Sequence, residues 1–192
     1  MTDLLRAHIQ TKIRLSDEEF ALTERLFTRK ELKRRQFLHR QGEVCRYESF
    51  VGNGCLKSYH TDDQGVEHVL RFSVEGWWAG DLDSFRNQTP SAFGIQALEP
   101  TTLLVIDQPT LQDLYRQVPK METFFRLLNE NALIATSQRM IKNLSIPAKN
   151  RYELFLSTYP HLARRLPLKD IASYLGITPV FLSRLRRQRT GE

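Results

Sequence analysis

Cysteine is scarce in this sequence, because Cys45 and Cys55 are the only two in 192 residues. They form neither a CxxC pair nor a neighbouring ligand group, which favours two free, reduced thiols over a disulfide framework or a zinc site. The chain also lacks any apolar run approaching the roughly 18 to 20 residues that span a bilayer. Its first ten residues, MTDLLRAHIQ, are too polar for a signal peptide. We therefore expect a cytoplasmic protein without a membrane partner.

The sequence has no excess of glycine or proline either. With 9 Gly, 8 Pro and 41% hydrophobic residues, the composition is that of a globular protein and excludes a disordered or fibrous chain. A length of 192 residues allows one large domain or two small ones.

Positive charge is concentrated at the C-terminal end of the chain. Residues 139–192 hold 11 Lys and Arg against 3 Asp and Glu, a net +8, whereas residues 1–138 hold 17 against 19, a net −2. A basic end on a near-neutral body favours a polyanionic partner for that end, because neutralised phosphates release counterions. A solvated basic surface is the alternative interpretation of the charge alone.

The stretch 166–187 has the pattern of two short helices around a tight turn. Gly176 supplies the backbone freedom of a sharp corner, Thr178 can cap the second helix, and Pro179 suits its first helical position. The apolar residues before the corner recur at helical spacing: Leu168, Ile171, Ala172 and Leu175. This order predicts a helix-turn-helix, whose second helix enters the major groove of DNA.

In the second predicted helix, one side is apolar and the other is polar. Leu182, Leu185 and either Val180 or Phe181 can face inward, and the outside then carries Ser183, Arg184, Arg186 and Arg187. Only residues 188–192 follow, and five residues cannot build a β-hairpin wing. We therefore expect a C-terminal all-α helix-turn-helix domain without a complete wing.

The region from residue 31 to residue 107 alternates between apolar and polar residues. Gly, Asp and Asn clusters interrupt it at intervals of about 8 to 12 residues, as in an all-β domain. The predicted strands are 32–38, 47–51, 55–61, 67–73, 94–97 and 101–107. Helical patterns precede them, and Ser16 with Glu19 predicts a capping box. We expect an α+β fold with an N-terminal antiparallel β jelly roll.

A long helical pattern without a breaker runs over residues 120–144. Such a helix would measure about 37 Å, too long to be covered by one small neighbour, which predicts pairing with a second copy of the chain. Packing on the roll and on the C-terminal domain is the alternative. The predicted contacts of this dimerisation helix are Phe124, Leu128, Asn131, Ala135 and Ile141.

The patterns divide the chain into three regions. Residues 1–110 form the roll with its N-terminal helices, residues 111–146 the dimerisation helix, and residues 147–192 the DNA-binding domain. This order resembles the CRP/FNR family of bacterial transcription regulators, in which a cyclic-nucleotide-binding-type jelly roll is joined through a dimerisation helix to a DNA-binding domain. The most specific similarities are IASYLGITPVFLSRLRR, HRQGE at 39–43, and the glycines Gly65, Gly76 and Gly80.

The resemblance implies a homodimer that binds double-stranded DNA, with RNA polymerase as an open further partner. It places Arg184 where an Arg can read guanine O6 and N7. Pro179 and Val180 replace groove-facing residues that are charged in a cyclic-AMP-responsive member, so the operator should differ, and Val180 could touch a thymine methyl. The full predicted DNA-binding set is Thr178, Pro179, Val180, Ser183, Arg184, Arg186, Arg187 and Lys169.

The resemblance also implies an effector pocket. Cyclic-nucleotide binders of the family carry Gly-Glu-Leu, a spacer and then Arg-Ser-Ala; Pro90 stands here in place of the arginine. Losing that charge-assisted pair should cost about 1.5 to 3 kcal/mol, so we expect an effector other than cyclic AMP, or none. A cyclic nucleotide is the disfavoured alternative. The implied pocket residues are Gly80, Asp81, Leu82, Ser91, Ala92, Thr136 and Ser137.

Other functions compete with this interpretation. A ligand-sensing dimer that acts through a protein partner would show no salt-sensitive binding to nucleic acid. A cupin-like enzyme would bind a metal through His39, His60 and His68, but these form no HxH pair with a following Glu. Two cysteines cannot hold a four-Cys iron-sulfur cluster. We therefore expect no catalytic residues and no metal site.

Overall fold

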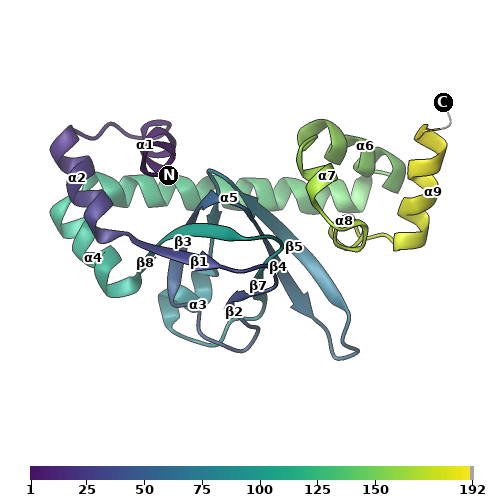
Figure 1. Cartoon of the computed structure of the whole chain (residues 1–192), viewed down its shortest axis with the longest axis horizontal. Coiled ribbons are helices and arrows are strands. Elements are labelled where there is room, and N and C mark those ends of the chain that lie inside the picture. Colours follow the sequence, from purple (N-terminus) through teal and green to yellow (C-terminus); the bar gives the residue numbers. More distant parts are fainter. Residues whose placement is uncertain (191–192) are drawn as a thin grey trace.

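Two four-stranded antiparallel sheets form a roll at the centre of the chain (Figure 1). The computed structural model describes residues 1–190, with side chains to residue 188. One sheet has the order β1-β8-β3-β6 and the other β2-β7-β4-β5. The strands are β1 Thr28–Leu32, β2 Phe37–His39, β3 Tyr47–Asn53, β4 Cys55–Thr61, β5 Glu67–Val74, β6 Trp78–Ala79, β7 Gly94–Ala97 and β8 Thr101–Asp107. The predicted jelly roll is confirmed.

The predicted strand 32–38 was wrong. The chain turns after Leu32, where the Gln36 N–H donates to the Lys33 carbonyl at 2.9 Å and Arg35 has a φ of 67°. Leu32 pairs with Thr101 in one sheet, whereas Phe37 pairs with Gln96 in the other. The alternating pattern runs through this crossing because both ends of the segment are extended, so periodicity alone could not separate them.

The N-terminal helices pack on the outer face of the first sheet. They are α1 Thr2–Gln10 and α2 Asp17–Leu26, and α2 begins with the predicted capping box between Ser16 and Glu19. With α4 Gln108–Gln117 they enclose a core around Phe50 and Phe124. A short helix that periodicity did not predict, α3 Leu82–Asn87, follows β6.

The long helix is α5, Lys120–Ser145, with 26 residues. Figure 1 shows it crossing the whole length of the molecule, with α1, α2 and α4 at one end and α6 to α9 at the other. Its first turns are buried through Met121, Phe124 and Phe125. None of the helices described between residues 1 and 190 combines the length and the apolar character that a membrane crossing requires.

The C-terminal helices are α6 Ala148–Thr158, α7 Leu162–Arg165, α8 Leu168–Tyr174 and α9 Pro179–Thr190. Their apolar side chains belong to one cluster with Tyr59, Val69 and Phe72 on the outer face of the second sheet. The helix-turn-helix therefore shares a hydrophobic core with the roll. Gly191 and Glu192, the end of the predicted third region, lie outside the described residues.

Candidate nucleic-acid interface and effector cradle

The corner between α8 and α9 is built from backbone hydrogen bonds. The Gly176 N–H donates to the Ser173 carbonyl and the Ile177 N–H to the Ala172 carbonyl, both at 3.0 Å. Gly176 has a φ of 65°, a conformation in which a side chain would be strained. Gly176 thus allows the sharp turn between the two helices, as the sequence predicted.

Thr178 caps α9 as its position suggested. Its Oγ1 accepts the Phe181 N–H at 3.1 Å, which satisfies one of the amides that a helix start leaves without a partner. Leu182 and Leu185 are buried beneath the helix, whereas Val180 and Phe181 are both exposed. The inward face is therefore formed by the leucines, and neither Val180 nor Phe181 belongs to it.

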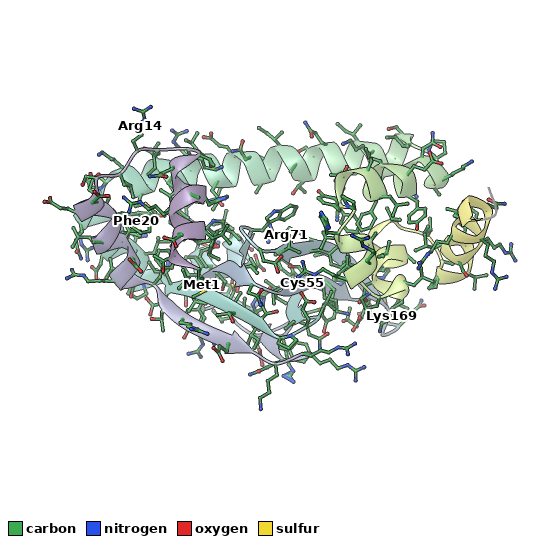
Figure 2. All side chains as sticks on the ribbon, turned by 45° about the horizontal axis from the view of Figure 1, so that its top comes forward. Met1, Arg14, Phe20, Cys55, Arg71 and Lys169 are labelled. Carbon is green, nitrogen blue, oxygen red and sulfur yellow. The ribbon has the colours of Figure 1, made fainter. Side chains whose placement is uncertain are left out.

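The outward side of α9 carries Val180, Arg184 and Arg187, because residues three and four apart share one side of a helix. Arg186 is also exposed, and Ser183 is half-buried at the edge of this side. Pro179 and Lys169 are exposed as well, and Lys169 projects from the start of α8 (Figure 2). The predicted DNA-binding residues thus lie on accessible parts of two adjacent helices.

Some C-terminal cations serve the fold instead of a surface. The Arg151 guanidinium donates to the carbonyls of Asn143, Ile146 and Leu175 at 2.8 to 3.0 Å, which ties the end of α5 to the end of α8. Arg165 forms ion pairs with Glu75 and Glu99 of the roll. The net charge of +8 therefore overstates the positive charge that the interface can offer.

The cradle predicted for an effector is closed by its own hydrogen bonds. Asp81 Oδ1 accepts the N–H groups of Asp83 and Ser84 at 3.2 and 3.4 Å, so this carboxylate caps α3. Its Oδ2 accepts the Ser91 hydroxyl at 2.6 Å, and Ser91 also lies 2.8 Å from the Phe93 carbonyl. Both side chains are buried. Two of the predicted effector-pocket residues are therefore bonded to each other.

Two charged side chains lie beside this cradle, where sequence reasoning had placed none. A Cβ on Gly80 would lie 2.9 Å from Glu48 Oε2, so a larger residue there would require the Glu48 side chain to shift. Arg71 Nη2 donates to the Gly80 carbonyl at 3.4 Å, and Figure 2 shows Arg71 between the sheet and the long helix. Burial raises the pKa of Glu48 to about 7, Arg71 opposes this shift and Asp81 adds to it.

Within the described part of the chain, the other predicted pocket residues form no hydrogen bond with the side chains of Asp81 or Ser91. Leu82 and Ala92 are exposed, and the Ala92 carbonyl faces His60 Nδ1 at 2.8 Å. Thr136 is exposed on α5 and donates its hydroxyl to the Ala132 carbonyl at 2.8 Å. Ser137 lies between Leu133 and Ile141 on the exposed side of the same helix. The structure therefore joins Gly80, Asp81 and Ser91 but not the others.

The predicted dimer register on α5 needs a correction. Phe124 is fully buried in the core of its own chain and Leu128 packs against that core. Asn131 and Ala135 are exposed, but they continue at four-residue spacing to Arg139, which donates to the Leu70 carbonyl of β5. Only Ile141 lies on the outward side. That side carries Leu133, Ile134, Met140, Ile141 and Leu144, of which Leu133 is 68% and Leu144 80% exposed.

The histidines and cysteines have structural surroundings. His68 Nε2 lies 2.7 Å from Asp62 Oδ2, and His39 is buried with its pKa lowered by burial. Among the residues that the structure describes, no three His, Cys, Asp or Glu side chains gather as metal ligands would. Both cysteines are free thiols and both are buried, and burial raises the pKa of Cys45 to about 11 and of Cys55 to about 12.

Known proteins are similar to this chain in sequence and in fold. Residues 29–118 match the family model for the cyclic nucleotide-binding domain. The chain is 29% identical to regulatory protein HlyX of Actinobacillus pleuropneumoniae over 192 residues, covering 92% of this chain and 79% of HlyX. It is 28% identical to the fumarate and nitrate reduction regulatory protein of Escherichia coli K12 over 195 residues, covering 92% and 76%. The chain is thus similar to transcription regulators of the CRP/FNR family and contains a match to their cyclic nucleotide-binding domain.

A solved member of the family has the same fold. FixK2 from Bradyrhizobium japonicum superposes with a TM-score of 0.75 at 17% sequence identity, over 84% of this chain and 83% of FixK2. Within the CRP/FNR frame, α8 and α9 form the helix-turn-helix and Gly80 to Ala92 contains the cassette turn. In this turn Pro90 offers no positive charge, and Asp81 and Ser91 are bonded to each other.

Proposed function

We propose that this CRP/FNR member acts as a homodimer that binds DNA sequence-specifically through α9. The observation that carries the proposal is the exposed outward side of α9, with Val180, Arg184 and Arg187, on a helix anchored by Leu182 and Leu185. In this proposal residues 1–110 form the sensing roll and 147–192 the DNA-binding domain. Residues 111–146 contain the dimerisation helix, which is α5 and begins only at Lys120, because α4 extends to Gln117 and packs in the core of the roll. We assign the chain no catalytic role.

Different residues of α9 have different proposed tasks. Arg184 reads a guanine through O6 and N7, and Val180 touches a thymine methyl. Arg186, Arg187 and Lys169 contact phosphates, which position the protein without reading sequence. Thr178 and Pro179 shape the helix start, and Ser183 lies at the edge of the contact. These tasks rest on the exposure of each side chain and on the positions of the family.

The exposed apolar side of α5 supports the dimer. Leu133, Ile141 and Leu144 lie on one side of a helix whose other side contacts the roll through Arg139. A stripe of large apolar residues along an unpaired helix is stabilised when an equivalent stripe covers it. Two copies joined in this way would present two α9 helices to successive major grooves, about 34 Å apart.

We propose that any effector of this protein is not cyclic AMP. Asp81 and Ser91 are bonded to each other, so neither side chain is available to a phosphate in the cradle. Pro90 stands where a cyclic-nucleotide binder has its arginine, and the Arg71 guanidinium beside Gly80 already interacts with the Glu48 carboxylate.

Selection of bound duplexes from a random pool tests the DNA-binding function. A recovered palindrome with half-sites about one helical turn apart supports it. Fluorescence anisotropy at two salt concentrations separates it from a sensor that acts through a protein partner, because log affinity should fall with log salt by about 0.9 per phosphate contact. Absence of binding to duplex DNA at low salt would contradict the proposal.

Two substitutions on α5 test the dimer and its register. Ile141→Glu places a charge on the exposed apolar side and should convert the dimer to a monomer in analytical ultracentrifugation. Asn131→Glu places the same charge on the side of the helix that continues to Arg139, and it should leave the dimer intact. The opposite pattern would show that the stripe with Asn131 forms the interface.

A further inference from the structure

The DNA-binding helices are attached to the edge of the roll by hydrogen bonds from α8. Because β5 is the last strand of its sheet, its outer backbone groups have no neighbouring strand. The Ser173 hydroxyl meets two of them: it accepts the Val69 N–H and donates to the Glu67 carbonyl, both at 2.8 Å. One side chain of the helix-turn-helix thus satisfies a donor and an acceptor of the sheet edge.

A buried ion pair lies in the same contact. Lys57 Nζ of β4 lies 3.5 Å from Asp170 Oδ1 of α8, and the two side chains are only 3% and 4% exposed. Lys57 also pairs with Glu67, at the start of β5. Asp170 Oδ2 has no hydrogen-bond partner among the described residues. A buried ion pair with an oxygen that lacks a hydrogen bond contributes little to the net free energy of folding. We therefore expect it to have another role.

The apolar part of the contact is large but not directional. Phe72 of β5 stacks at 5.3 Å on Tyr174 of α8, and Tyr59 and Val69 belong to the same cluster as the α8 residues. Hydrophobic burial tolerates small rotations of one body on another because it depends on area alone. The Ser173 bonds and the Lys57–Asp170 pair do not, because each needs specific atoms to meet. These polar contacts therefore define the orientation of α8 on the roll.

The contact leaves the DNA side of the helices uncovered. Lys169 is exposed although Asp170 beside it is buried, and Val180 and Arg184 of α9 are exposed as well. The roll therefore does not mask the residues proposed to read DNA. What the contact can change is the angle at which each subunit presents α9.

We propose that Lys57, Asp170 and Ser173 are positioning residues that set the spacing of the two DNA half-sites. Together we call them the α8 latch. The proposal rests on the dimeric DNA-binding function above. In each subunit the latch holds α8, and through Gly176 also α9, at one angle to the roll and to α5. Because α5 carries the proposed dimer contact, that angle defines the distance between the two recognition helices.

Calorimetry of the full chain tests the latch without DNA. The wild type should unfold in one transition, because roll and C-terminal helices share a core. Lys57→Met leaves the buried Asp170 without its cation, and Ser173→Ala removes both bonds to β5 without leaving a buried charge behind. Each should separate the unfolding of the C-terminal helices from that of the roll. Lys33→Met, the same change at an exposed lysine on the β1–β2 turn, is the matched control and should keep one transition.

Binding to duplexes with different half-site spacings tests the positioning role. In the wild type, the best spacing should bind about 100-fold tighter than a single half-site, because the second contact is then intramolecular. In Lys57→Met and Ser173→Ala the preference among spacings should fall below roughly threefold, with affinity for a single half-site unchanged. Lys33→Met should keep the wild-type preference.

The outcomes separate the latch from the function on which it rests. One unfolding transition and a wild-type spacing preference in both latch variants would overturn the proposal, and so would a preserved preference after the transitions have separated. If no protein, wild type included, binds any duplex, the DNA-binding function fails and the spacing role with it. Calorimetry then still shows whether the latch joins the C-terminal helices to the roll.

Discussion

The cassette turn and helix α9, for which we propose sensing and DNA binding, use their polar groups in opposite ways. In the cassette turn, Asp81 bonds to Ser91 and caps α3 inside the protein. On α9, Arg184 is exposed on the outward side. Polar groups bonded to one another stabilise a fold, whereas exposed ones are available to a partner.

This difference separates the two ends of the molecule. The helix-turn-helix has its glycine turn, its threonine cap and an outward side with exposed arginines. In the roll, Pro90 stands where the resemblance implies an arginine, and Glu48 and Arg71 lie beside Gly80. The polar groups of the cassette turn are thus bonded within the fold, whereas those of α9 face outward.

The largest effect is expected from Asp81→Ala in the cassette turn. It removes the cap of α3 and leaves the buried Ser91 hydroxyl without its carboxylate, which should lower the free energy of unfolding by about 2 to 4 kcal/mol in urea titrations. Asp63→Ala, at an exposed hairpin position, is the control and should change it by less than about 0.5 kcal/mol. A stable Asp81→Ala protein would show that this carboxylate is free to serve a ligand.

In contrast to Asp81→Ala, Arg184→Ala should change DNA recognition and leave the stability of the fold unchanged. Its side chain is exposed, so the free energy of unfolding should stay within about 0.5 kcal/mol of the wild type. Discrimination at one base pair should fall by roughly 1 to 3 kcal/mol in competition binding, whereas Arg187→Ala should weaken binding to all sequences alike. Equal, sequence-blind losses from both changes would identify Arg184 as a phosphate contact.

The pH dependence of stability should report Glu48. Burial raises its pKa from 4.5 to about 7, so between these pH values the folded state holds a proton that the unfolded state has lost. The free energy of unfolding should therefore fall by roughly 3 kcal/mol as pH rises through this window, and stay level above it. In Glu48→Gln this contribution should disappear. Parallel pH curves for the two proteins would mean that Glu48 titrates normally.

The smallest effect is expected from cyclic AMP. At about 1 mM it should leave the melting temperature unchanged, because a ligand stabilises only a fold that binds it. Pro90→Arg restores the charge of the family's cassette but not its free carboxylate and hydroxyl, so it should not restore the response. A clear rise in melting temperature for Pro90→Arg would show that the missing charge alone had closed the cradle.

Local signals predicted a large part of the structure. The capping box at Ser16, the turn at Gly176, the cap at Thr178 and the unbroken pattern of α5 each depend on residues a few positions apart. Helical and extended periods are properties of a short segment, so the sequence alone could place most helices and strands. The segment 32–38 shows the limit of this reasoning, because an extended chain looks the same in one sheet or between two.

The face of α5 could not be predicted in the same way. Its apolar residues lie all around the helix, at Phe124, Phe125, Leu133, Ile134 and Leu144, so no single stripe marks a partner. The roll covers one side of α5, and this packing leaves the other side exposed. The predicted register with Phe124 and Leu128 failed for this reason.

By itself the sequence determined the class of the protein, the helix-turn-helix and the absence of the cassette arginine, because each depends on residues that lie close together in the chain. Tertiary structure alone decided that Asp81 is bonded to Ser91, that Glu48 lies beside Gly80, and that Lys57 meets Asp170, 113 residues further along the chain. The sequence shows which residues carry a charge or a hydroxyl group. Whether such a group serves the fold or a partner depends on which distant groups the packing brings within hydrogen-bond distance.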